Sequence, residues 1–338
     1  MAVRFKAQSK FIKAFSRIRM IINEFFEKGI YYSWKLAIYN SAWWIGNYCH
    51  PLVKLQFWAK DRITQWTNKY ISNNGFLPQY RINSEEDIDT YYFWVFWWQG
   101  EDSMPELVKG CFLQLSSHNE NVTLVTKDNI RSYCNIPDYI FDKVDKGLIS
   151  LTHFSDIVRV SLLAEHGGMW IDSTCWTINK IPQDIKNRIL ISPKTINVPD
   201  FPWWSNSRWC GWCMGTNKKN NPLFVFTRDF FYIFYKHNSR IPFYLFIDYL
   251  YDYAYRNFKD VRRMFDSIPE NNLERGQLHF CLNKSWDYEQ YLRLTKNTWV
   301  FKLSYKSLWK HENAGQTTFY AQLIGKAIAN NEKKDWIR

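Results

Sequence analysis

Residues 153–174 read HFSDIVRVSLLAEHGGMWIDST, and this stretch decides the fold class. Its first part has the apolar spacing of a helix and predicts one over residues 152–166. The glycine pair at 167–168 provides a stop for that helix. The apolar residues that follow predict a strand over residues 169–174. A helix that feeds through Gly-Gly directly into an apolar strand is typical of an α/β protein.

Three ionisable residues occupy special places in this stretch. Asp156 and Arg159 are spaced i,i+3, so a helix brings both onto one face. Asp172 stands where the predicted strand ends, at the carboxyl edge of the sheet, where α/β proteins bind ligands. A surface ion pair would explain the first two residues alone. The whole arrangement favours a binding site.

The flanking sequence continues the alternation of strands and helices. An aromatic run at residues 91–98 predicts a buried strand bounded by Gly100, and Ser103 and Pro105 then predict a helix start. This alternation predicts an α/β sheet with parallel strand pairs. Further strands are predicted at 122–126 and 298–305, and helices at 127–134, 137–146, 222–237, 242–258 and 317–331.

Composition indicates a folded protein. The chain has 338 residues, of which 22% are charged and 19% aromatic, so it holds enough apolar material for one large or two modest domains. Its seven cysteines, an odd number scattered along a long chain, do not resemble a disulfide framework and favour a reducing compartment. No convincing secretory signal is visible, which favours a cytosolic location.

The positive charge is concentrated at the N-terminus. Residues 1–81 hold thirteen Lys or Arg against three acids, whereas the whole chain has a net charge of +12. Helices are predicted at 5–26, where Gly29 is a natural stop, at 31–49 and at 52–72, with turn residues from Asn73 to Pro78 closing an arm of residues 1–82.

This basic arm has three possible roles. It is a helical cap on the main domain, an in-plane anchor on an anionic membrane, or an electrostatic surface for nucleic acid. Its thick apolar face suits lipid better than nucleic acid. The uncharged stretch at 36–53 contains Asn40, His50 and Pro51, which argue against a membrane span.

The central stretch resembles the Ser-Asp-x-x-Arg and Gly-Gly-x-Trp-x-Asp core of the capsular polysaccharide synthesis family. That family has the GT-A glycosyltransferase fold, a Rossmann-like fold that binds nucleotide sugars, and is related to certain mannosyltransferases and to the large clostridial glucosylating toxins. The resemblance runs from about Phe93 to Lys306. It implies a catalytic domain over residues 83–338, with a donor-binding sheet at 83–200 and a helical acceptor side at 201–338.

The resemblance also implies a donor and its contacts. The donor is a UDP-sugar, with Trp98 stacking on the base and Arg159 binding phosphate. Together with their neighbours in the matching motifs, the residues expected to bind donor are Trp97, Trp98, Gln99, Asp156, Arg159, Ile171, Asp172, Ser173, Thr174 and Lys306.

A divalent metal ion is implied as well, either Mn²⁺ or Mg²⁺, with Asp172 as its carboxylate ligand and catalytic residue. The sequence has Asp-Ser-Thr where many relatives have Asp-x-Asp, so the second carboxylate is missing and His311 is a candidate to complete the ligand set. Asp248 is a second candidate catalytic residue, which would orient an acceptor hydroxyl. Retention of anomeric configuration is implied.

Two other patterns compete with this interpretation. The residues Trp209-Cys210-Gly211-Trp212-Cys213 resemble a thioredoxin redox motif, but the required strand before it and helix on it are not predicted. One Cys pair also cannot close a zinc site. The missing second Asp leaves open an inactive relative that binds sugars or acts as a scaffold.

The sequence therefore predicts a glycosyltransferase that transfers a hexose, either galactose or glucose, from a UDP-sugar to a lipid-linked oligosaccharide in capsular or surface polysaccharide synthesis. The expected location is cytoplasmic, peripheral on the inner face of the cell membrane. Nucleic acid is not an expected partner.

Overall fold

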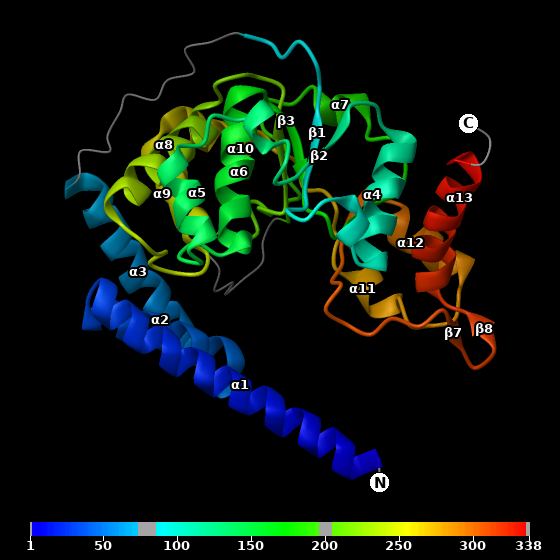
Figure 1. The fold of residues 1–338 in the computed structure, drawn as a ribbon, viewed down its shortest axis with the longest axis horizontal. Helices are drawn as coiled ribbons and strands as arrows, with labels where there is room; N and C mark the ends of the chain where they lie inside the picture. The colour runs from blue at the N-terminus through cyan, green and yellow to red at the C-terminus, as the bar shows by residue number, and fades with distance from the viewer. Residues whose placement is uncertain (1, 74–85, 196–204, 336–338) are drawn as a thin grey trace. The chain divides into compact units, whose positions relative to one another are not determined.

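The computed structural model describes residues 2–73, 86–195 and 205–335, which form two compact units (Figure 1). Of the described residues, unit 1 comprises 2–73, 205–206 and 237–253, and unit 2 comprises 86–195, 207–236 and 254–335. The predicted domain boundary at residues 82–83, and Asn74 to Pro78 of the predicted turn, lie outside the described residues. Unit 1 thus contains a segment, 237–253, that the sequence analysis placed in the helical acceptor side.

Unit 1 consists of the long helices α1 (Ala2–Tyr31), α2 (Trp34–Tyr48) and α3 (Val53–Asn73), a short 3-10 turn (His50–Leu52) and residues 246–253 of α9 (Phe246–Asn257). The three predicted N-terminal helices are confirmed. Gly29 does not end the first one; α1 continues to Tyr31, and Ser33 then caps α2 by accepting a hydrogen bond from the Leu36 amide. Among the described residues, no helix is long and apolar enough to cross a membrane.

The segment around residue 241 packs into unit 1 through buried polar groups. Lys28 is buried, and its ammonium pairs with Glu27 at 2.7 Å and donates to the carbonyl of Ile241. Asn40 is also buried, and its amide donates to the carbonyls of Leu36 and Pro242. Because buried polar groups are costly unless they are hydrogen-bonded, these contacts bind the segment specifically.

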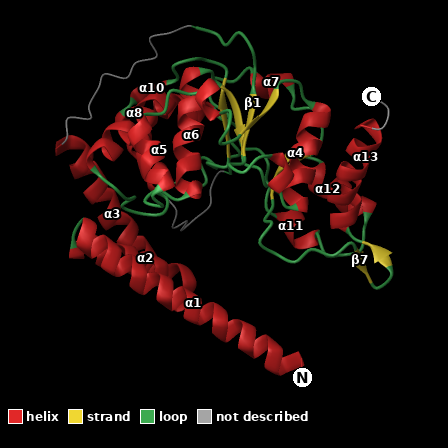
Figure 2. Ribbon diagram, in the orientation of Figure 1, coloured by secondary structure: helices red, strands yellow, loops and turns green. Residues whose placement is uncertain are grey.

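Unit 2 is built on a four-stranded sheet of order β2-β1-β3-β5. Figure 2 shows its strands in yellow among the red helices. Strand β1 (Phe93–Phe96) pairs in parallel with β2 (Val122–Val125) and β3 (Gly168–Ile171), and β3 pairs antiparallel with β5 (Cys213–Thr216). The mixed sheet with its helical crossovers confirms the predicted α/β class. Parallel strands place their carboxyl ends at one edge, so the ends of β1 and β3 share an edge.

The sheet of unit 2 is covered on both faces, which is why the central strands are continuously apolar. One face carries Phe93 and Met169, which pack with Leu115 of α4 (Glu106–His118). The other face carries Phe96 and Trp170, and Phe96 contacts Phe154 of α6 (Leu151–Glu165) at 6.1 Å between ring centroids. Every residue of β1 and β3 is buried as a result.

The remaining elements of unit 2 are mostly short helices. In chain order they are two 3-10 turns (Glu101–Ser103 and Ile130–Ser132), α5 (Asp138–Asp145), β4 (Cys175–Thr177), α7 (Gln183–Lys186), α8 (Pro222–His237), α10 (Lys259–Ser267), α11 (Gln277–Cys281), α12 (Tyr288–Thr295), β6 (Val300–Lys302), β7 (Glu312–Asn313), β8 (Gln316–Thr317), a π-helical turn (Ala321–Gly325) and α13 (Lys326–Asp335).

Four local predictions were wrong. The predicted strand over 169–174 is interrupted after Ile171 by a turn, and β4 then pairs with β6 in a separate sheet. The predicted helix over 127–134 is only a 3-10 turn. Ser103 does not cap a helix; its hydroxyl instead accepts a hydrogen bond from Trp97, and α4 begins after Pro105. The helix predicted over 242–258 begins only at Phe246.

Candidate functional site

The Gly-Gly pair determines where the site lies. Both glycines have positive φ, +67° at Gly167 and +81° at Gly168, in the region that disfavours other residues. A Cβ on Gly168 would lie 2.3 Å from the carbonyl oxygen of Tyr92, the residue before β1. The chain can therefore turn from α6 into β3 and pair closely with β1 only with glycine there. Strand β3 then delivers Asp172 to the edge of the sheet.

The backbone holds Asp172 in a turn at this edge. Its amide donates to the carbonyl of Trp212, and its own carbonyl accepts from the amide of Cys175, both at 2.8–2.9 Å. Trp212 comes from the loop before the antiparallel strand β5. The three strands β3, β4 and β5 thus meet around one aspartate.

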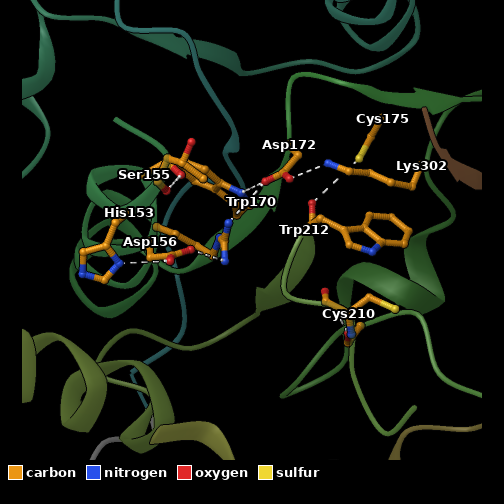
Figure 3. A network of polar contacts seen from close by, with 12 residues as sticks. His153, Ser155, Asp156, Trp170, Asp172, Cys175, Cys210, Trp212 and Lys302 are labelled. Carbon is orange, nitrogen blue, oxygen red and sulfur yellow. Dashed lines mark hydrogen bonds and ion pairs between the residues drawn. The ribbon is translucent and has the colours of Figure 1, made fainter. Parts of the chain in front are cut away.

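Three N–H donors surround the Asp172 carboxylate (Figure 3). Its Oδ1 accepts from Trp170 Nε1 at 2.8 Å and from Arg159 Nη2 at 3.3 Å. Its Oδ2 lies 2.5 Å from Lys302 Nζ. The side chain is 26% exposed, so it faces both the protein and solvent. An aspartate with two cationic partners at a strand end is a feature of a charged binding site rather than of a core.

A second carboxylate continues the cluster along α6. Arg159 Nη1 pairs with Asp156 Oδ1 at 3.1 Å, so one guanidinium bridges Asp156 and Asp172. Asp156 Oδ2 lies 3.4 Å from Nδ1 of the buried His153. The predicted i,i+3 pair is confirmed, and Arg159 is buried, with its guanidinium 5.1 Å from the ring centre of Trp170. Charge-assisted pairing with two separate carboxylates fixes the position of the guanidinium.

The opposite charges in the cluster stabilise one another in their ionised forms. Burial acts to raise the pKa of Asp172, but the positive charges of Lys302 and Arg159 outweigh it, and the pKa lies below its ordinary value. Burial acts to lower the pKa of Lys302, and the Asp172 carboxylate more than reverses this, so the pKa lies above its ordinary value. Both groups are therefore ionised at neutral pH.

Lys302 is the site residue that sequence reasoning missed. It ends β6, a three-residue strand that pairs with β4 so that Lys302 lies opposite Cys175. The sequence predicted a strand over 298–305, but a pairing across more than a hundred residues leaves no local signal. The one local feature that pointed to Lys302 is its charge, which directly follows the two buried residues Val300 and Phe301 in that strand.

The residues here do not fit the divalent cation that the resemblance implies. Mg²⁺ requires several oxygen ligands in near-octahedral geometry. Both oxygens of Asp172 already accept from N–H donors, and Asp156 Oδ1 pairs with Arg159. Over the ranges that the structure describes, no group of three or more His, Cys, Asp or Glu could hold a metal ion.

His311 makes its contacts with residues outside this cluster. Its Nε2 lies 3.0 Å from Oε1 of Glu106, at the start of α4, and its ring contacts Tyr320. The pairing of His311 with Asp172 as metal ligands is therefore not supported by any contact among the described residues.

The aromatic residues after β1 lie at the same sheet edge as Asp172. Trp98 is half-buried, packs its ring edge-on against Phe154, and has Lys127 Nζ 5.9 Å from its ring centre. Trp97 contacts Tyr305 and donates to Ser103, and Gln99 is exposed. A partly open tryptophan beside a lysine leaves part of one ring accessible to a planar ligand.

The other residues that were predicted to bind the sugar donor differ in their exposure to solvent. Ile171 is buried in the core of the sheet, so its side chain packs rather than binds. Thr174 is also buried, and its carbonyl accepts from Leu303, whereas Ser173 is half-buried in the turn. Lys306 is exposed.

Asp248 lies in the part of α9 that belongs to unit 1, whereas Asp172 belongs to unit 2. Its predicted role toward an acceptor hydroxyl stays a prediction.

The Cys-x-x-Cys sequence leads into a strand and lacks the features of a redox site. Cys213 begins β5 instead of a helix, and burial raises the pKa of its thiol well above the ordinary value. A reactive cysteine needs the opposite shift. Neither Cys210 nor Cys213, both described residues, forms a disulfide. Pro202, Trp203 and Trp204, which precede the motif in the sequence, lie outside the described residues.

These observations define an α/β protein with a charged ligand site at the carboxyl edge of its sheet. The family model described as capsular polysaccharide synthesis protein matches residues 53–323, and the chain belongs to this family. A role in capsule biosynthesis, of transferase type, follows from that membership. No curated protein matches the chain.

Proposed function

We propose that the protein is a retaining GT-A hexosyltransferase that moves galactose or glucose from a UDP-sugar to a lipid-linked oligosaccharide. The observation that carries this proposal is the cluster of Asp156, Arg159, Asp172 and Lys302 at the sheet edge, within a member of the capsular synthesis family. Its two cations suit a diphosphate, and its two carboxylates suit sugar hydroxyls.

In the proposed reaction, the bond between the anomeric carbon and the diphosphate oxygen breaks, and its electron pair leaves with UDP. The anomeric carbon forms a bond to the acceptor oxygen, and the acceptor proton passes to the departing phosphate. Arg159, fixed by two carboxylates, would stabilise the charge that develops on the leaving group. Trp98 would stack on the uracil ring.

The experiment that tests this proposal is proton NMR of the full chain with UDP-glucose and UDP-galactose, alone and with lipid-linked acceptor extracts. We expect consumption of one of the two donors and an α-linked product. Failure to consume any UDP-hexose contradicts hexosyl transfer, and a β-linked product contradicts retention.

The location proposed for this reaction is the inner face of the cell membrane, and an apolar stripe on unit 1 supports it. Five exposed residues of α1 lie on one helix face, because their spacing is three or four, and Phe26 contacts the exposed Trp34 of α2 at 6.5 Å. This α1 stripe consists of Phe15, Ile18, Ile22, Phe26, Ile30 and Trp34.

Exposed basic side chains accompany the α1 stripe. Arg19 falls on the same helix face, and Lys35 follows Trp34. A helix with an apolar face and adjacent cations binds in the interface of an anionic bilayer, where the cations meet lipid phosphates. Confinement to the bilayer would raise the local concentration of a lipid-linked acceptor.

Replacing three stripe residues tests this location. We expect the Phe15→Ser, Ile22→Ser, Phe26→Ser variant to lose at least about tenfold in affinity for vesicles containing phosphatidylglycerol, because each buried apolar side chain contributes roughly 1.5–3 kcal/mol when fully inserted. Cosedimentation with these vesicles measures the affinity. Leu308→Ser, which removes an exposed leucine of unit 2, is the matched control and should bind as wild type. Unchanged sedimentation of the triple variant, or preferential binding to RNA or DNA, contradicts the membrane role.

A further inference from the structure

The partly exposed side chain of Lys302 carries a positive charge at the candidate site. Its ammonium has three N–H donors. In the part of the chain that the structure describes, Asp172 Oδ2 is the one hydrogen-bond acceptor of Nζ, at 2.5 Å, and the Trp212 ring lies 6.0 Å away. The side chain is 33% exposed. Donors therefore remain for a ligand at the edge of the sheet.

The position of this ammonium is fixed by the fold. Lys302 ends β6, whose pairing with β4 sets it opposite Cys175, three residues after Asp172. Asp172 is held in turn by Trp170 and by the buried Arg159. A lysine normally has a flexible head, but here one carboxylate orients it, so the charge is preorganised rather than recruited when a ligand binds.

The two positive side chains beside Asp172 disfavour a divalent metal ion at this carboxylate. The two carboxylates of Asp156 and Asp172 are matched by Arg159 and Lys302, so the four groups sum to zero. A divalent cation that reached Asp172 would lie beside two positive side chains and would have to displace one of them. A diphosphate would instead accept from the N–H donors of Lys302 that Asp172 does not use.

We propose that Lys302 is the cation that neutralises the departing diphosphate, in the place where related enzymes use a divalent metal ion. The inference rests on the proposed function, and it makes Lys302 a catalytic residue. The bond changes are those given above: the electron pair of the cleaved bond stays on the diphosphate, the acceptor proton goes to that phosphate, and Lys302 remains protonated throughout, acting through charge and N–H donation alone.

The test is isothermal titration calorimetry of UDP into the full chain, in EDTA and then with excess Mn²⁺, for wild type, Lys302→Met and Lys302→Arg. We expect wild type to bind in EDTA with an affinity that Mn²⁺ changes little. Lys302→Met should bind at least about tenfold more weakly, the loss typical of one charge-assisted hydrogen bond, and Lys302→Arg should recover most of it. Lys296→Met, an exposed lysine of the same unit, should bind as wild type.

A second variant serves as the control for misfolding, because Lys302→Met removes one of the two positive charges that neighbour Asp172. The double variant Lys302→Met, Asp172→Asn removes both charges and should fold yet bind UDP as weakly as the single one. Binding that appears only with Mn²⁺, or wild-type affinity in Lys302→Met, overturns this inference and leaves the hexosyltransferase proposal standing. Absence of UDP binding under every condition overturns both.

Discussion

Asp172→Asn is expected to lower turnover of a UDP-hexose by about 10²–10³-fold, the loss found when one preorganised charge or donor at a reacting centre is removed. The change keeps the shape of the side chain but removes the negative charge that orients Arg159 and Lys302. Both cations would then repel each other without a counter-charge between them. The rate of donor consumption at saturating substrate measures the effect.

The same substitution should also reduce stability modestly. Asp172 and Lys302 are each partly exposed, so solvent screens the loss, and we expect about 1–2 kcal/mol in the free energy of unfolding by urea. Asp184→Asn is the matched control, since Asp184 is an exposed carboxylate of unit 2 paired with Arg188 at 3.3 Å. It should leave turnover unchanged. Turnover of Asp172→Asn within threefold of wild type would remove this residue from the site.

Gly168→Ala is expected to destabilise unit 2 by about 3 kcal/mol, from a left-handed backbone that costs roughly 1–2 kcal/mol and overpacking that costs roughly 1–3 kcal/mol. The added methyl would lie 2.3 Å from the carbonyl oxygen of Tyr92, and backbone cannot move aside as a side chain can. Urea unfolding followed by tryptophan fluorescence measures the change.

Gly147→Ala separates the two causes. Gly147 also has a positive φ, +66°, but a Cβ there meets nothing within 4 Å. It should therefore cost only the backbone contribution, about 1–2 kcal/mol. Equal destabilisation by the two variants would show that the close approach of β3 to Tyr92 is not what requires glycine at 168.

The part of the fold that could be predicted from the sequence is the part with local signals. Apolar periodicity and the Gly-Gly stop located α6 and β3, and the i,i+3 spacing of Asp156 and Arg159 predicted a pair that the structure contains. The position of Asp172 at the edge of the sheet could be predicted in the same way, because this residue comes directly after a buried strand. These predictions needed no knowledge of distant parts of the chain.

The parts that could not be predicted depend on long-range pairing. Strand β5 begins at Cys213 in a segment without strand periodicity, and it forms only because its backbone completes the edge of β3. Lys302 reaches Asp172 through the pairing of β6 with β4, and Lys28 binds the carbonyl of Ile241, 213 residues away in the sequence. The apolar pattern alone predicted one continuous strand over residues 169–174. In the structure, a turn after Ile171 ends β3 and leads the chain into β4.

The most direct test of the central claim, that the Asp172 cluster binds a nucleotide sugar, is the melting temperature of the protein across a panel of nucleotide sugars. A ligand at a hundred times its dissociation constant stabilises the folded state by about 2.7 kcal/mol. We predict that one UDP-hexose raises the melting temperature of wild type and leaves that of Asp172→Asn unchanged. A panel in which no nucleotide sugar shifts wild type, or one that shifts both proteins equally, would contradict the claim.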